Sequence, residues 1–325
     1  MRALLASVAI GLLAATPAIH AQPAQEPVSQ GQAAAERLDR AQLLDDLRSL
    51  AADDMAGRQA GSPGGARARA YIIDRLEAMG VAPQGEGFEH SFVFSTREDP
   101  DKDVTGVNVL ARIEGRSESD RTMVVSAHYD HLGAHGGEIW NGADDNASGV
   151  ASVLAVAAEF MAHPPEHDVI LAFVDAEESG LRGARAFVAA PPVPLENITF
   201  NLNMDMVAMS EDRILWAVGT YHYPFLVPVV EAVAARADVS MPMGFDQPSE
   251  DPGADWTFAT DSGAFHAAGI PFIYLGVDFH QHYHQPSDTY ENMTLDFFQD
   301  ASASIVDFAR VADENLDMIG EAAGR

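Results

Sequence analysis

The sequence predicts an α/β fold, a single domain in which helices flank a central mixed, mostly parallel β-sheet. The first observation behind this prediction is length, because 325 residues are enough for one large α/β domain. The second is the alternation of strand-like and helix-like segments after residue 106. The third is a short loop between the first two of these strand-like segments, which predicts an antiparallel pair and therefore a mixed sheet.

The N-terminus has the pattern of a secretory signal peptide. Arg2 precedes an apolar run from Ala3 to Ala15, and small residues continue to Ala21. The run is too short to span a membrane, so we expect a signal peptide at residues 1–21 and export to a periplasm or to the medium. Residues 22–36 are polar and rich in Pro and Gln, which predicts a disordered spacer before one folded domain at 37–325.

The first part of the domain is expected to be helical. Four leucines recur near helical spacing, namely Leu38, Leu43, Leu44 and Leu47. A second helical pattern over residues 64–81 ends at Gly80, where a glycine terminates a helix readily. The glycine-rich segment "MAGRQAGSPGG" predicts a loop between the two helices.

The rest of the domain alternates between the two element types. Short apolar runs predict strands at 106–115, 121–130, 169–174, 198–209, 213–219 and 270–277. Patterns of helical period predict helices at 147–162, 181–190, 223–238 and 295–312. This order is typical of one sheet with helices on both faces.

Composition restricts the function. The chain has no cysteine, which excludes thiolate nucleophiles, cysteine-zinc sites and iron–sulfur clusters. Asp and Glu number 49 against 19 Lys and Arg, so the formal charge is −30, and neither nucleic acid nor an anionic membrane surface is a favourable partner. The lysine Lys102 lies in the acidic segment "DPDKD", where we expect it to be solvated rather than catalytic. Cations are the favoured ligands.

Residues that can bind metal follow the predicted strands or open the helix at 147–162. They are His128 and Asp130, Asp144 and Asp145, Asp175, Glu177 and Glu178, Asp205, and His280, His282, His284 and Asp288. Each group alone has an ordinary explanation, such as a surface hydrogen bond or a helix N-cap. The carboxyl ends of the strands of one sheet meet at one edge, however, so the groups should converge. Asp205 supports this view, because an unpaired carboxylate in such an apolar segment would be costly to bury.

Such a cluster of carboxylates needs a counter-charge, because they would repel one another in a cleft of low dielectric. Arg182 and Arg185 could offset part of the charge, but they belong to the following helix. Two divalent metal ions would neutralise the cluster, and histidine with carboxylate ligands favours zinc. Two-metal hydrolytic sites hold their ions about 3.5–4 Å apart, usually with a bridging carboxylate.

Five motifs in order, "HYDHLG", "NGADDNASG", "DAEESGLRG", "NMDM" and "YHQPSDT", resemble those of the di-zinc aminopeptidases of metallopeptidase family 28. The resemblance runs from about Leu43 to the last helix and implies the zinc-dependent exopeptidase fold, without an inserted domain before the first motif. It implies two Zn²⁺ ions held by five ligands, namely His128 and Asp205 on one ion, Glu178 and His284 on the other, and Asp145 between them.

The same resemblance implies the roles of further residues. Glu177 matches the general base, Asp130 would orient His128, and Tyr283 stands where some relatives have an oxyanion-stabilising tyrosine. The remaining histidines of these segments are not expected to be ligands, namely His131, His135, His280 and His282. Relatives often carry an Asp-His pair where this chain reads "TDSGAF", so Asp261 receives no role.

The implied reaction is hydrolysis of N-terminal residues from peptides with a free N-terminus by zinc-activated water, with Glu177 accepting a proton. The negative charge favours a substrate α-ammonium group, and hence an aminopeptidase over a carboxypeptidase. Three alternatives stay open, namely a glutaminyl cyclase with one zinc, a carboxypeptidase, and a non-enzymatic binding module of the same fold. A serine hydrolase is disfavoured because no G-x-S-x-G motif occurs. The preferred N-terminal residue and the oligomeric state are left open.

Overall fold

The computed structural model describes residues 37–96, 101–251 and 253–325. The predicted signal peptide and the predicted spacer lie outside the described residues. Within these ranges, no helix is both long enough and apolar enough to cross a membrane.

The described residues form an eight-stranded sheet with a parallel centre and antiparallel edges. The order along the sheet is β1-β3-β7-β4-β8-β10-β9, and β2 also pairs with β3. The bounds are β1 Ala82–Pro83, β2 Glu89–Ser95, β3 Asp103–Ile113, β4 Thr122–His128, β7 Asp168–Val174, β8 Ile198–Met204, β9 Trp216–Val218 and β10 Phe272–Gly276. Strands β7, β4, β8 and β10 run parallel, whereas β3 is antiparallel to β7 and β9 to β10. The predicted fold class is confirmed.

The mixed sheet arises differently from the expected hairpin between 106–115 and 121–130. Strand β7 lies between β3 and β4, so the loop between these two strands passes the start of β7. There the N–H of Gly115 donates to Asp168 Oδ1 at 2.9 Å, and a Cβ on Gly115 would lie 2.4 Å from the backbone of His167. All residues of β4 and nearly all of β7 are buried, and strands buried on both faces take central places.

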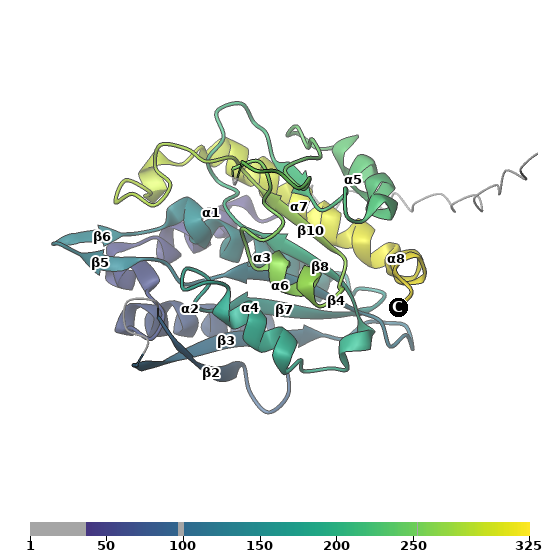
Figure 1. Cartoon of the computed structure of the whole chain (residues 1–325), viewed down its shortest axis with the longest axis horizontal. Helices are drawn as coiled ribbons and strands as arrows, with labels where there is room; N and C mark the ends of the chain where they lie inside the picture. Colours follow the sequence, from purple (N-terminus) through teal and green to yellow (C-terminus); the bar gives the residue numbers. More distant parts are fainter. Residues whose placement is uncertain (1–36, 97–100, 252) are drawn as a thin grey trace, which may run out of the picture.

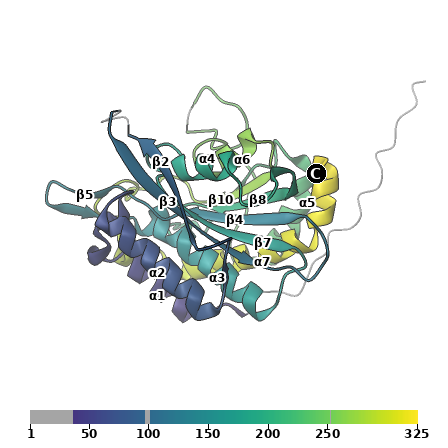
Figure 2. The ribbon, with the colours of Figure 1, turned by 90° about the horizontal axis from the view of Figure 1, so that it is seen from below.

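Helices cover both faces of the sheet, as Figure 1 and Figure 2 show. One face packs against α1 (Arg40–Leu50), α2 (Pro63–Met79), α3 (Gly149–Ala162), α5 (Val227–Ala234) and α7 (Leu295–Glu314). The other packs against α4 (Arg182–Ala189) and α6 (Ser262–Ala267). Neighbouring residues of β4 point to opposite faces, since Val125 joins the first core and Val124 the second.

Several short elements were not expected. They are β2, α6, α8 (Leu316–Ala323) and the arm β5 (Gly133–His135) with β6 (Glu138–Trp140), which projects from the body in Figure 1. The expected helix at 223–238 is shorter, because a 3₁₀ turn at Pro224–Leu226 precedes α5. The second expected helix ends as predicted, with Gly80 in the left-handed conformation (φ 76°).

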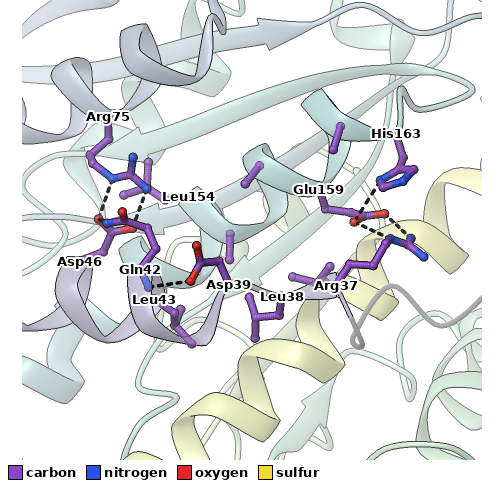
Figure 3. A pocket seen from close by; sticks show the side chains of 14 residues that line it. Arg37, Leu38, Asp39, Gln42, Leu43, Asp46, Arg75, Leu154, Glu159 and His163 are labelled. Atoms are coloured by element: carbon purple, nitrogen blue, oxygen red, sulfur yellow. Dashed lines mark hydrogen bonds and ion pairs between the residues drawn. The ribbon is translucent and has the colours of Figure 1, made fainter.

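The layer of α1, α2, α3 and α7 encloses a small cavity of about 160 Å³, shown in Figure 3. Its carboxylates are paired, because Asp46 accepts from Arg75 Nε at 2.7 Å and Glu159 accepts from Arg310 Nε at 3.1 Å. These pairs link the helices to one another. The third carboxylate among the described residues of the cavity wall is Asp39, which caps α1 by accepting from the N–H of Gln42.

Candidate metal centre

The predicted ligands meet at the carboxyl edge of the sheet, although they come from separate segments. His128 is the last residue of β4, and Asp205 follows β8 directly. Glu178 lies just beyond β7, and His284 lies in the loop after β10. Asp145 lies in the turn Ala143–Ser148 that opens α3. The convergence expected from the parallel strand ends is confirmed.

The five side chains divide into two groups that share Asp145. In the first, His128 Nε2 lies 3.3 Å from Asp145 Oδ1 and 3.3 Å from Asp205 Oδ1. In the second, His284 Nε2 lies 3.1 Å from Asp145 Oδ2 and 3.3 Å from Glu178 Oε2. The two carboxylate oxygens of Asp145 therefore face different groups, which is the arrangement of a bridging ligand.

The donor atoms and their spacing fit zinc. Around a tetrahedral ion with bonds of about 2.0–2.1 Å, neighbouring ligand atoms lie about 3.3–3.4 Å apart. The separations within both groups are 3.1–3.3 Å, and the side chains offer imidazole nitrogen and carboxylate oxygen. A cation also has an electrostatic reason to bind here, because Asp145, Glu178 and Asp205 are almost fully buried beside one another.

His131 lies in the second group, although the resemblance gave it no ligand role. Its Nδ1 lies 2.8 Å from Glu178 Oε1 and 3.8 Å from Asp145 Oδ2, and these three side chains could also hold a metal ion. His131 is buried, and its Nε2 has no hydrogen-bond partner among the described residues. The contact of His131 with Glu178 orients the Glu178 carboxylate. That His131 is not itself a ligand stays a prediction. The sequence signal was its place in "HYDH", three residues after His128.

The other histidines lie apart from both groups. His280 Nε2 lies 2.8 Å from Asp144 Oδ2, so this pair ties the loop after β10 to the turn before α3. His282 contacts Ser287 at the surface, and His135 contacts the carbonyl of Leu132 in the projecting arm. Asp144, the first acid of "GADDN", is thus engaged by His280, which leaves Asp145 to face the two groups.

Asp288 fixes the backbone of the same turn. Its carboxylate accepts from the N–H of Asp144 at 2.8 Å and from the N–H of Asp145 at 3.1 Å. Burial and the neighbouring Asp144 raise the pKa of Asp288 to about 6.

Glu177 and Asp130 lie side by side behind the first group. The N–H of Glu177 donates to Asp130 Oδ1 at 3.0 Å. Asp130 faces His128 Nδ1 through its carbonyl at 3.2 Å and its carboxylate at 3.6 Å. Burial, with the negative charges of Asp261, Asp205 and Glu178 nearby, raises the pKa of Glu177 well above its ordinary value. A carboxylate of raised pKa can accept a proton from water and hold it.

Two more residues of the sequence analysis lie near the centre. The ring of Tyr283 stacks on His284 with centroids 3.9 Å apart, and burial raises the pKa of its hydroxyl. Asp261, which received no role, is fully buried, and neither carboxylate oxygen has a hydrogen-bond partner among the described residues. Burial and the charges of Asp205 and Asp130 raise the pKa of Asp261 to about 8. Its position next to an apolar helix was a sequence signal of burial.

Arg58 is the residue that the sequence analysis missed. It is fully buried, and its guanidinium donates to main-chain carbonyls on both sides of the projecting arm. Nε donates to Tyr129 O at 2.9 Å, Nη1 to Asn141 O at 2.5 Å and Nη2 to Gly142 O at 2.8 Å. Arg58 therefore fixes the segment of His128 relative to the segment of Asp145. The signal was an arginine inside a glycine-rich loop, where Gly57 (φ 66°) has no room for a Cβ beside Gly133 O.

Comparison with known proteins agrees with this site. The profile of peptidase family M28 matches residues 108–309, more than half of the chain. The vacuolar membrane protease of Schizosaccharomyces japonicus is 34% identical over 160 residues, 47% of this chain and 18% of that protein. A probable zinc metalloprotease of Pyrenophora tritici-repentis is 33% identical over 113 residues, 33% of this chain and 23% of that protein. The matched region thus spans less than a quarter of the length of these relatives.

Solved structures share the fold. The LapA aminopeptidase of Legionella pneumophila superposes with a TM-score of 0.69 at 17% identity, over 92% of this chain and 77% of that chain. A glutaminyl cyclase of Fimbriiglobus ruber superposes with a TM-score of 0.68 at 20% identity, over 90% of this chain and 99% of that chain. The profile match, the ordered motifs and the convergent site agree, and the chain belongs to peptidase family M28.

Proposed function

We propose that this protein is a zinc-dependent aminopeptidase that binds two Zn²⁺ ions and releases N-terminal residues from peptides. The observation that carries the proposal is the position of Asp145, whose two oxygens face the His128–Asp205 pair and the Glu178–His284 pair separately. The two ions, when bound, would polarise the scissile carbonyl and lower the pKa of water.

The protein's own residues then position groups and move a proton. Glu177, held through its N–H by Asp130, accepts the proton of the attacking water on its carboxylate. Protonated Glu177 then donates that proton to the leaving amine. Asp130 keeps the Nδ1–H of His128 occupied, so that Nε2 is the free ligand atom. We propose that the hydroxyl of Tyr283, whose ring stacks on His284, stabilises the oxyanion.

The charges around the centre favour an N-terminal over a C-terminal substrate group. A carboxypeptidase needs a cation free to bind the substrate carboxylate. The buried Arg58 donates to main-chain carbonyls, and Arg182 Nε donates to Ser179 O. The carboxylates that surround the site would instead attract an α-ammonium group.

A glutaminyl cyclase is the second candidate, because a cyclase shares the fold over 90% of this chain. The complete pair of metal groups favours the aminopeptidase, since the cyclase alternative requires one zinc. We further propose export of the protein, on the signal-peptide pattern of residues 1–21.

A substrate panel on the zinc-loaded full chain tests the proposal. We expect release of leucine from leucine p-nitroanilide and from free peptides, and no cleavage of N-acetylated peptides. Cyclisation of N-terminal glutamine as the main reaction would establish the cyclase instead. Removal of C-terminal residues from acetylated peptides would establish a carboxypeptidase.

A further inference from the structure

A groove of about 870 Å³ opens beside the candidate metal centre and shares three of its residues. Asp130, His131 and Glu178 line one part of it. The remaining walls come from the loop at 59–62, from the base of the projecting arm, and from the ends of β2 and β3. Pockets for small molecules occupy about 300–1,000 Å³, so this groove is at the upper end of that range.

The position of the scissile bond in an aminopeptidase substrate limits what such a groove can bind. One residue lies before the scissile bond, and every other residue of the peptide lies after it. A space of this size that is continuous with the metal centre therefore exceeds what a single terminal residue fills. We infer that the groove binds the peptide chain on the carboxyl side of the scissile bond, so that the enzyme prefers oligopeptides of several residues to dipeptides. This inference rests on the proposed aminopeptidase function.

The lining suits a peptide chain of mixed sequence. Phe94 and Val104 are direct partners across β2 and β3, and with Leu132 they give the groove apolar surface. Gln59 adds a side-chain amide that can hydrogen-bond to peptide groups.

The charges at the β3 end of the groove offset one another. Lys102 and Asp103 are adjacent, exposed and both line the groove. Binding of residues remote from the scissile bond can be used to raise kcat as well as to lower KM.

The experiment measures kcat/KM for leucyl peptides of two to six residues and for leucine p-nitroanilide, with the full chain and two variants. In the wild-type protein, we expect kcat/KM to rise about 10- to 100-fold from the dipeptide to the pentapeptide. Val104→Trp places a large ring in the groove, because Val104 is a partly exposed strand residue on the same face as Phe94, and strand positions tolerate aromatic residues. It should lower kcat/KM for the pentapeptide at least 5-fold and change that for leucine p-nitroanilide less than 2-fold.

Val93→Trp is the matched control, because Val93 lies on the face of β2 opposite to Phe94 and Val104, is 66% exposed and lies outside the groove lining. It should leave both substrates unchanged. A wild-type enzyme that cleaves leucine p-nitroanilide and shows no rise with peptide length would overturn the inference, whether or not the Val104 variant folds. Absence of cleavage of every unblocked substrate would instead contradict the proposed function.

Discussion

Replacing Arg58 with methionine should destabilise the protein severely and loosen the metal centre. The guanidinium donates to Leu50 O at 2.7 Å as well as to Tyr129 O, Asn141 O and Gly142 O at 2.5–2.9 Å. Hydrogen bonds that involve a charged group contribute about 1.5–3 kcal/mol each, and buried carbonyls left unpaired are costly. Burial opposes this gain and lowers the pKa of Arg58 to about 10.

After this offset, we expect Arg58→Met to lower the free energy of unfolding by about 3–5 kcal/mol, because four buried carbonyls lose this donor and each unsatisfied buried group costs about 1–3 kcal/mol. That is a large part of the roughly 5–15 kcal/mol of a typical domain. Arg58→Lys should also destabilise, because an ammonium group cannot reproduce the planar fork of donors that reaches both segments. Urea unfolding measures the stability, and zinc titration of the folded fraction measures the site.

Arg75→Met is the matched control. Arg75 is a partly buried arginine paired with Asp46 in the helical layer, as Figure 3 shows. Asp46 keeps a hydrogen bond from Tyr71 at 2.6 Å after this change but loses its counter-charge, so the free energy of unfolding should also fall by about 3–5 kcal/mol, whereas zinc binding should be unchanged. Arg58→Met with a stability within about 1 kcal/mol of wild type and normal zinc affinity would refute the assigned role of Arg58.

Three further predictions follow from the site and its surroundings. Glu177→Gln should keep both zinc ions but lower kcat by roughly 10²–10⁴-fold, as loss of a general base does. Glu178→Gln should instead weaken zinc binding. If metal analysis showed that Glu177→Gln loses zinc and Glu178→Gln keeps it, both assignments would be contradicted. Dialysis against a chelator should abolish activity and added zinc should restore it, and full activity of metal-free protein would exclude the proposed chemistry. Despite burial, Asp313 and Asp317 raise the pKa of His167 above its ordinary value, so this pairing stabilises the fold below about pH 6.5 and the stabilisation is lost as pH rises through the raised pKa. The difference in Tm between wild type and His167→Gln should therefore shrink from pH 6 to pH 9, and a difference that grows would show that the sign is wrong.

Much of the site could be predicted because its ligands follow strands whose direction and burial are readable. Strands β4 and β8 are buried throughout and β7 is buried after its first residue, and parallel strands deliver the residues at their carboxyl ends to one edge. That rule brings the groups that contain His128, Glu178 and Asp205 together, whereas the choice of ligands within each group is what the family resemblance implies. The strand order does not follow, because it depends on which apolar strands take central places, and the loop from β3 to β4 is equally compatible with a hairpin.

The contacts of His131 and Arg58 depend on loop conformations that leave weak marks in the sequence. Ala176, Met206 and His284 have positive φ although they are not glycine, and each is beside or among the site residues. Such conformations are over-determined by the surrounding structure rather than by local preference. Loop 55–65 contacts both ends of the projecting arm, and this contact likewise depends on the tertiary structure. The strands of the arm are too short to be predicted from the sequence pattern.

The central claim is that Asp145 bridges two zinc ions, and anomalous scattering at the zinc edge from a crystal of the zinc-loaded protein tests it most directly. The account predicts two peaks about 3.5–4 Å apart, one beside His128 and Asp205 and one beside Glu178 and His284, with Asp145 between them. A single peak, or two peaks of which one lacks contact with Asp145, would contradict it.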